Sequence, residues 1–99
     1  MNLELNQVYT FKLSSGEEMV AKVLNTSDGF IEISEPVSIA PNQQGLGIVP
    51  SLFTSDMSGK FMLNTSTVAM YATTGEQIKM KYIEATTGLV VPEKKILVG

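Results

Sequence analysis

The sequence predicts a mostly β protein, a small and strongly bent antiparallel barrel with one C-terminal helix. Apolar and polar residues alternate along Val8–Leu13, which is the period of a half-buried strand. Short turns rich in Gly, Asn, Asp and Ser separate several such stretches. The hydrophobic period becomes helical only after residue 72. With 99 residues we expect one domain, in which 1–72 form the barrel and 73–99 form a helix and tail packed on it.

The first two predicted strands are Val8–Leu13 and Met19–Leu24, separated by a turn that contains Gly16. The second strand ends on "LNTS", a tetrapeptide that recurs at Leu63–Ser66. We expect "NTSDG" to form the next turn, since Asp-Gly is a strong hairpin dipeptide. Three strands joined by such short turns would make an antiparallel meander.

The third predicted strand starts at Phe30, bends at Pro36 and resumes through Ile39. We expect a loop at 41–47 and then an extended segment at 46–53. Pro50 indicates an edge position for that segment, because proline cannot donate to a central ladder.

Two further strands are predicted at Lys60–Leu63 and Thr67–Ala72, with the second "NTS" as the turn between them. Thr73–Gln77 resembles a capping box, and the pattern after it predicts an amphipathic helix of about three turns ending at Gly88. Ile78, Tyr82, Ile83 and Ala85 would form its apolar side. Short extended pieces are expected at 89–92 and 96–98.

The composition excludes several classes of chemistry. The chain has no Cys and no His, so thiol nucleophiles, Cys/His zinc sites and histidine acid–base catalysis are absent. No nucleophile–base pair can be assembled, and we predict a protein that is not an enzyme, with no metal and no cofactor. The formal net charge is -3 and every basic residue is lysine, which argues against a strongly basic nucleic-acid surface. No signal peptide or membrane-length apolar segment is visible, so we expect a cytoplasmic protein.

Two motifs resemble those of the Sm-like family, which includes the LSm and Hfq-like proteins. In the first, Leu13, Gly16, Met19, Val20 and Val23 occupy the motif positions, and Ala21 stands where Gly is usual. The second is the stretch "LNTSTVAMY", in which Asn-Thr stands where the family has Arg-Gly. Together the motifs cover about a third of the chain, and strand order extends the resemblance over roughly residues 8–72. Short, divergent versions from phages are the most similar, which would place the protein in the host cytoplasm.

The resemblance implies a five-stranded barrel whose subunits join through the fourth and fifth strands into a ring. We therefore expect a cyclic homo-oligomer that uses Phe61–Leu63 and Val68–Tyr71. Both runs are apolar at successive positions, as expected of strands buried against the barrel on one face and against a neighbour on the other. The number of subunits is not encoded in any motif.

The resemblance also implies RNA binding at the inner rim of the ring, where two loops meet. The corresponding residues are Asn25, Ser27, Asp28, Phe30, Asn64 and Thr65. The residues that usually read the base and contact the phosphate are replaced, and Asn, Thr and Ser are also the residues that turns require. Two alternatives stay open: weak binding of RNA or single-stranded nucleic acid at this rim, and a protein-interaction or assembly module that has lost RNA binding.

Overall fold

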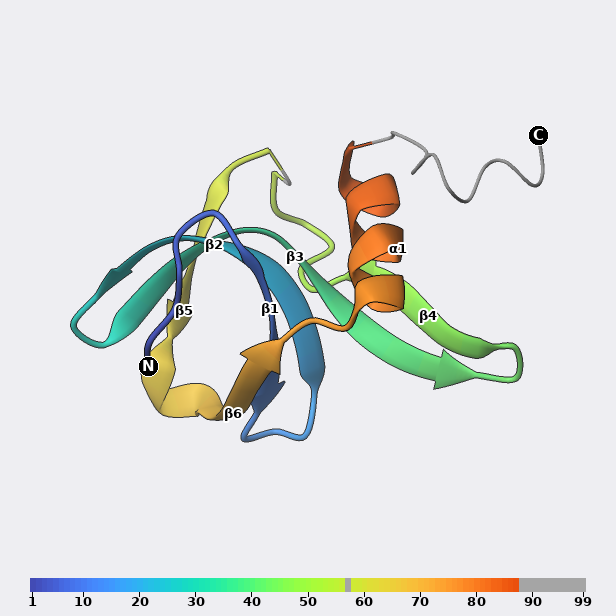
Figure 1. The fold of residues 1–99 in the computed structure, drawn as a ribbon, viewed down its shortest axis with the longest axis horizontal. Coiled ribbons are helices and arrows are strands. Elements are labelled where there is room, and N and C mark those ends of the chain that lie inside the picture. The colour runs from blue at the N-terminus through green and yellow to red at the C-terminus, as the bar shows by residue number, and fades with distance from the viewer. Residues whose placement is uncertain (57, 88–99) are drawn as a thin grey trace.

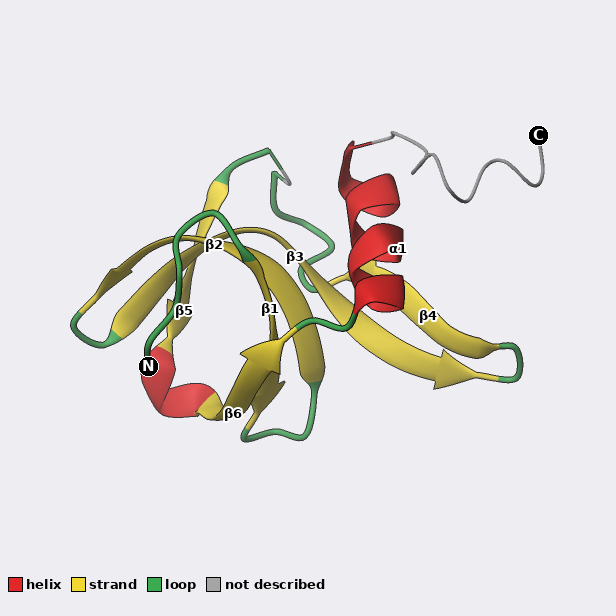
Figure 2. Cartoon of the chain, viewed as in Figure 1, coloured by secondary structure: helices red, strands yellow, loops and turns green. Residues whose placement is uncertain are grey.

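A computed structural model describes residues 1–56 and 58–87 of the chain. The described residues form six strands, one 3₁₀ helix (η1) and one α-helix, in the order shown in Figures 1 and 2. Their bounds are β1 Val8–Leu13, β2 Glu18–Ser27, β3 Phe30–Asn42, β4 Gly45–Pro50, β5 Lys60–Asn64, η1 Thr65–Thr67, β6 Val68–Thr73 and α1 Glu76–Thr87. The predicted mostly β class with one helix is confirmed. The expected helix end at Gly88 and the extended pieces at 89–92 and 96–98 lie outside the described residues.

All six strands belong to one antiparallel sheet with the order β4-β3-β2-β1-β6, and β5 pairs with β3. The strand β3 therefore has two partners on its second edge: residues 30–34 pair with β5, and residues 37–42 pair with β4. No pairing joins β5 to β6 in the described residues, so the sheet stays open between them. The sequence predicted five strands closed into a barrel, whereas the structure has six strands in an open sheet.

The sixth strand arises where the sequence predicted a loop at 41–47. Here β3 continues to Asn42 and pairs with β4 in a hairpin that extends away from the rest of the sheet (Figure 1). The ladder runs from Val37 opposite Pro50 to Asn42 opposite Gly45. Among the described residues β4 pairs with β3 alone, so the predicted edge position is confirmed for the part of this segment that is strand, which ends at Pro50.

The predicted bend near Pro36 is a bulge in β3. Val20 pairs with Val37 and Lys22 pairs with Ser34, so β3 has one residue more than β2 between these two pairs. Within the bulge Glu35 has φ 48°, a left-handed value that is uncommon for any residue except glycine. The bulge allows one long strand to change partners from β5 to β4.

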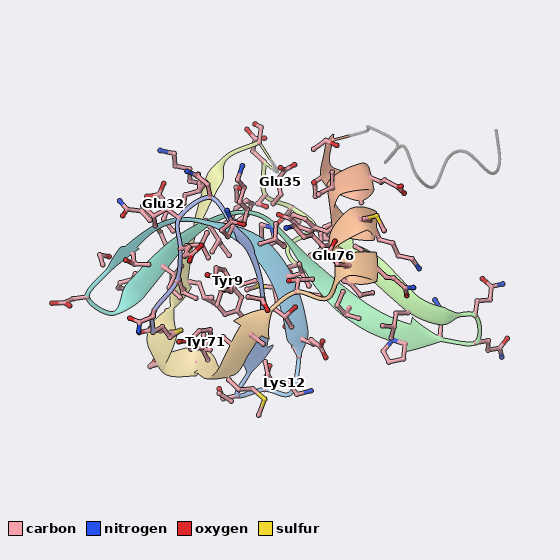
Figure 3. All side chains as sticks on the ribbon, viewed as in Figure 1. Tyr9, Lys12, Glu32, Glu35, Tyr71 and Glu76 are labelled. Atoms are coloured by element: carbon pink, nitrogen blue, oxygen red, sulfur yellow. The ribbon has the colours of Figure 1, made fainter. Side chains whose placement is uncertain are left out.

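The inner face of the bent sheet carries the main apolar core, in which Figure 3 labels Tyr9. Its buried members come from β1, β2 and β3, with Phe11 and Val23 fully buried. Leu3 from the N-terminal segment and Phe61 and Leu63 from β5 pack against them. The complete buried set is Tyr9, Phe11, Met19, Ala21, Val23, Ile31 and Ile33. Alternation along β1 and β2 therefore predicted the core face correctly.

The other face of the sheet is covered by α1, which buries Tyr82 against Val20 and Val37. Ile78 and Ile83 are half-buried in the same cluster, as the helical period predicted, whereas Ala85 is exposed. The helix has twelve residues, in agreement with the predicted three turns.

The start of α1 differs from the predicted capping box. The main-chain oxygen of Gly75 accepts from the Lys79 amide, so Gly75, and neither Thr73 nor Thr74, precedes the first helical turn. Thr73 ends β6, and the hydroxyl of Thr74 lies 3.0 Å from that of Thr10. The contact between Thr10 and Thr74 therefore links the segment between β6 and α1 to β1, and it does not cap the helix. This one helix of the described residues is neither long nor apolar enough to cross a membrane.

Candidate functional site

The turn between β2 and β3 is the first part of the candidate site. The ladder runs to the pair Ser27–Phe30, leaving only Asp28 and Gly29 between the strands. Gly29 has φ 85°, a left-handed value that glycine adopts at little cost. The predicted Asp-Gly hairpin is confirmed. The second strand does not end at Leu24, however, because β2 continues through the first "NTS".

The second part of the site is the junction between β5 and η1, which lies directly beside this turn. Phe30 pairs with Asn64 across the β3–β5 ladder. The Thr65 amide then donates to the main-chain oxygen of Gly29 at 3.0 Å. These contacts bring together the two segments that the sequence placed at one rim, although 35 residues separate them in the sequence.

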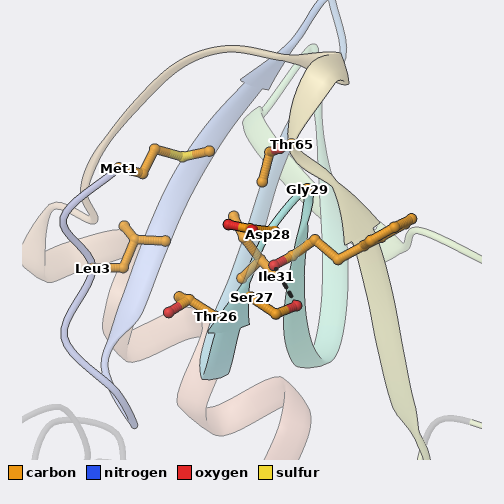
Figure 4. A pocket seen from close by; sticks show the side chains of 9 residues that line it. Met1, Leu3, Thr26, Ser27, Asp28, Gly29, Ile31 and Thr65 are labelled. Atoms are coloured by element: carbon orange, nitrogen blue, oxygen red, sulfur yellow. Dashed lines mark hydrogen bonds between the residues drawn. The ribbon is translucent and has the colours of Figure 1, made fainter.

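A pocket of about 370 Å³ opens between these two segments and the N-terminal residues (Figure 4). Leu3 and Met1 line one side, and the end of β2 and the turn line the other. The buried Ile31 also contributes to the wall. The full lining is Met1, Leu3, Thr26, Ser27, Asp28, Gly29, Phe30, Ile31 and Thr65.

Four of the six residues proposed from the sequence line this pocket: Ser27, Asp28, Phe30 and Thr65. Phe30 is 42% exposed, so part of its ring is accessible to a ligand. The Ser27 hydroxyl donates to the main-chain oxygen of Phe30 at 3.5 Å, a long hydrogen bond that leaves the hydroxyl oxygen able to accept.

The remaining two, Asn25 and Asn64, do not line the pocket. The Oδ1 atom of Asn64 accepts from the Ser66 amide at 3.0 Å and from the Ser66 hydroxyl at 2.9 Å, and so caps η1. Asn25 lies in β2 opposite Glu32, and its Oδ1 accepts from the adjacent Thr26 amide. The two "LNTS" copies thus differ in structure: one is strand, and the other ends a strand and starts a 3₁₀ helix.

The pocket has no basic side chain in its lining. Asp28 is the one charged side chain in its lining, and no lysine lines it. Lys60, at the start of β5, forms an ion pair with Glu32 at 3.4 Å. A phosphate group would therefore meet the Asp28 carboxylate here with no lysine side chain in the lining to offset it, whereas neutral hydrogen-bonding groups would be accommodated.

Sequence reasoning missed the N-terminal wall of the pocket. Met1 and Leu3 reach the site because the N-terminal segment runs back along β2, held by the Asn6 amide donating to the main-chain oxygen of Val23 at 2.6 Å. The segment is also anchored where the Asn2 amide donates to the Tyr71 hydroxyl at 3.1 Å. The apolar residues among the first five were the available signal, but nothing local shows where they pack.

The described residues contain no group of three or more His, Cys, Asp or Glu side chains that could hold a metal ion. The chain matches no protein-family model and no curated protein sequence. Its function therefore has to be argued from the sheet, its edges and this pocket.

Proposed function

We propose that the protein is a non-enzymatic, self-assembling protein of the Sm-like type, which forms a cyclic homo-oligomer through β5 and β6. The observation that carries this proposal is that β5 and β6 each have one unpaired edge among the described residues. Each also exposes a large apolar side chain, Met62 at 59% and Met70 at 66%.

The strand order supports the Sm-like architecture. Without the β4 hairpin, five strands remain, and the last two are joined by a single 3₁₀ turn, η1. The two strands then flank the sheet from opposite sides, β6 on β1 and β5 on β3. In this proposal β4 is an addition to the five-stranded arrangement.

The chemistry of the two edges supports head-to-tail pairing. An unpaired strand edge offers amide and carbonyl groups to another chain, and proteins usually cover or blunt such edges. Residues 68–72 of β6 carry no charge that would oppose pairing, and residues 61–64 of β5 carry none either. Joining β5 of one copy to β6 of the next would satisfy both edges and bury Met62, Met70 and Tyr71, and repetition would close a ring.

Native mass by light scattering tests the assembly. We expect the wild-type protein to have a mass several times that of one chain, and Met70→Glu to shift it toward the single chain. Gln43→Glu adds the same charge in the exposed β3–β4 turn and should leave the mass unchanged. A wild-type protein that stays a single chain at high concentration would refute the proposed ring.

A second function, weak binding of single-stranded nucleic acid at the candidate site, is favoured by one observation. Phe30 presents an accessible ring beside a pocket lined by hydroxyl groups, and aromatic stacking with a base needs no cation. Asp28 and the absence of lysine predict that any such binding is weak.

Titration with oligo-U and oligo-A at low salt separates this function from the alternative, a protein-interaction module. If bases stack here, Phe30→Ala should weaken binding about 5- to 150-fold, because one stacked base contributes about 1–3 kcal/mol. Phe53, 79% exposed and outside the pocket lining, supplies the control variant Phe53→Ala. An intact oligomer that binds neither oligonucleotide would favour the protein-interaction module.

A further inference from the structure

A second pocket, of about 240 Å³, lies between α1 and the sheet, on the helix side and away from the candidate site. Val8, Tyr82 and Ile83 of the apolar cluster under α1 form part of its wall. The other residues that line it have polar or charged side chains: Asn6, Gln7, Lys22, Glu35, Lys79, Thr86 and Thr87. This pocket plays no part in the proposed assembly or in nucleic-acid binding.

Backbone strain is concentrated at this pocket. Among the described residues, two that are not glycine have positive φ: Asn6 at 67° and Glu35 at 48°. Both line the pocket, although they come from the turn before β1 and from the β3 bulge. Such a conformation costs of order 1–3 kcal/mol at Glu35 and less at Asn6, because asparagine tolerates positive φ better, and strained residues are concentrated at functional sites.

The charged side chains around the pocket have both signs. Lys22 of β2 and Lys79 of α1 bring two ammonium groups, and Glu35 brings one carboxylate. None of the three forms an ion pair with another described residue. The ion pair found among the described residues joins Lys60 and Glu32. The charge of Glu35 lies near enough to Tyr82 of α1 to contribute, after burial, to a raised pKa of Tyr82.

The hydroxyl groups in the wall are already engaged. Tyr82 donates to the main-chain oxygen of Ser34 at 3.0 Å, and Thr86 donates to the main-chain oxygen of Tyr82 at 2.8 Å. The recognition groups left to a ligand are therefore the three charged side chains and the side-chain amides of Asn6 and Gln7.

The size and the charges together define the class of ligand. A volume of 240 Å³ is below the range of about 300–1,000 Å³ usual for drug-sized ligands, which indicates a molecule of few atoms. A simple anion could pair with Lys22 and Lys79 but would leave Glu35 unpaired, and a simple cation could pair with Glu35 but would leave the two lysines unpaired. We propose that this pocket binds a small zwitterion of the amino-acid type, with its carboxylate toward the two lysines and its ammonium group toward Glu35.

The test is an amide chemical-shift titration of the full chain with three probes: L-alanine, propionate and ethylamine. Propionate keeps only the carboxylate of alanine, and ethylamine keeps only its ammonium group. We expect saturable shifts at the pocket with alanine, at a Kd on the order of 1 mM, and binding at least about tenfold weaker for each half. Propionate that binds as tightly as alanine, or no saturable shifts well above millimolar alanine, would overturn the proposal.

Variants separate recognition from a structural role. Lys79→Gln should weaken alanine binding about tenfold, whereas Lys81→Gln, exposed on the same helix and outside the lining, should leave it unchanged. Glu35→Gln should weaken alanine binding and strengthen propionate binding, because it removes the group that repels an anion. Equal losses in the two lysine variants, or a fall in propionate binding with Glu35→Gln, would contradict the assignment.

Discussion

The hydroxyl of Tyr82 donates to the main-chain oxygen of Ser34 at 3.0 Å, across 48 positions of sequence. It joins α1 to the middle of β3, and the ring of Tyr82 is almost completely buried against Val20 and Val37. One side chain thus contributes both apolar burial and a hydrogen bond to the attachment of the helix.

Tyr82→Phe should lower the free energy of unfolding by about 1 kcal/mol, because it removes a partly buried hydrogen bond while keeping the ring. Urea unfolding measures the change. Tyr71→Phe is the matched control: the Tyr71 hydroxyl accepts from Asn2 at an exposed position, so its loss should cost less than about 0.5 kcal/mol. Equal losses in the two variants would show that the bond to Ser34 does not hold the helix.

Stability should fall at alkaline pH because of the same side chain. Burial, and then the charge of Glu35, raise the pKa of Tyr82 above its ordinary value of 10.0. The folded state therefore favours the neutral phenol, and the stability that Tyr82 contributes is present below pH 10 and lost as the pH rises above it. Urea midpoints at a series of pH values spanning this range should decline more steeply for the wild type than for Tyr82→Phe. Equally steep declines in the wild type and in Tyr82→Phe would contradict the raised pKa of Tyr82.

Asn64 and Asn25 occupy the same position in the two "LNTS" copies, and their substitution should have different effects. Asn64→Ala removes the cap of η1 and should cost about 1 kcal/mol, since its Oδ1 accepts from both the amide and the hydroxyl of Ser66. Asn25→Ala should change stability by less than about 0.5 kcal/mol, because Asn25 is exposed and its side chain accepts from the adjacent Thr26 amide, a local bond that holds no other element. Thermal unfolding of both variants gives the comparison, and similar costs would refute separate roles.

Local pattern was sufficient wherever one face of a strand is buried. Phe11 and Val23 lie in the core as the alternation predicted, and Asp28–Gly29 forms the predicted turn. The helix length also followed from its period. In each of these cases the signal lies within a few residues of the feature it determines.

Features that depend on distant partners could not be predicted in this way. Residues 41–47 are rich in turn-forming types, yet pairing with the other half of the hairpin makes most of them strand. Likewise Asn25 belongs to β2 because β3 continues the ladder beside it. The wall of the candidate site formed by Met1 and Leu3 depends on the position of the N-terminal segment beside β2, which no local pattern encodes.

The last prediction concerns Gly29, whose conformation holds the turn of the candidate site. A Cβ atom at Gly29 would meet nothing within 4 Å, so any cost of substitution comes from its φ of 85° and not from crowding. Gly29→Ala should therefore lower the free energy of unfolding by about 1–2 kcal/mol, and Gly29→Asn by less, because asparagine tolerates positive φ better. Chemical denaturation ranks the two variants.

Gly16 is the matched control, with φ 96° and equally open space, in the turn between β1 and β2. Gly16→Ala should have a similar cost in stability. Of these two variants, only Gly29→Ala should also alter oligonucleotide binding at the candidate site. The reason is that the Gly29 oxygen accepts from the Thr65 amide and thereby fixes the turn against η1. If Gly29→Ala had the same free energy of unfolding as the wild type, the left-handed conformation assigned to Gly29 would be wrong. If both variants changed binding equally, the effect would be one of global stability and not of the site.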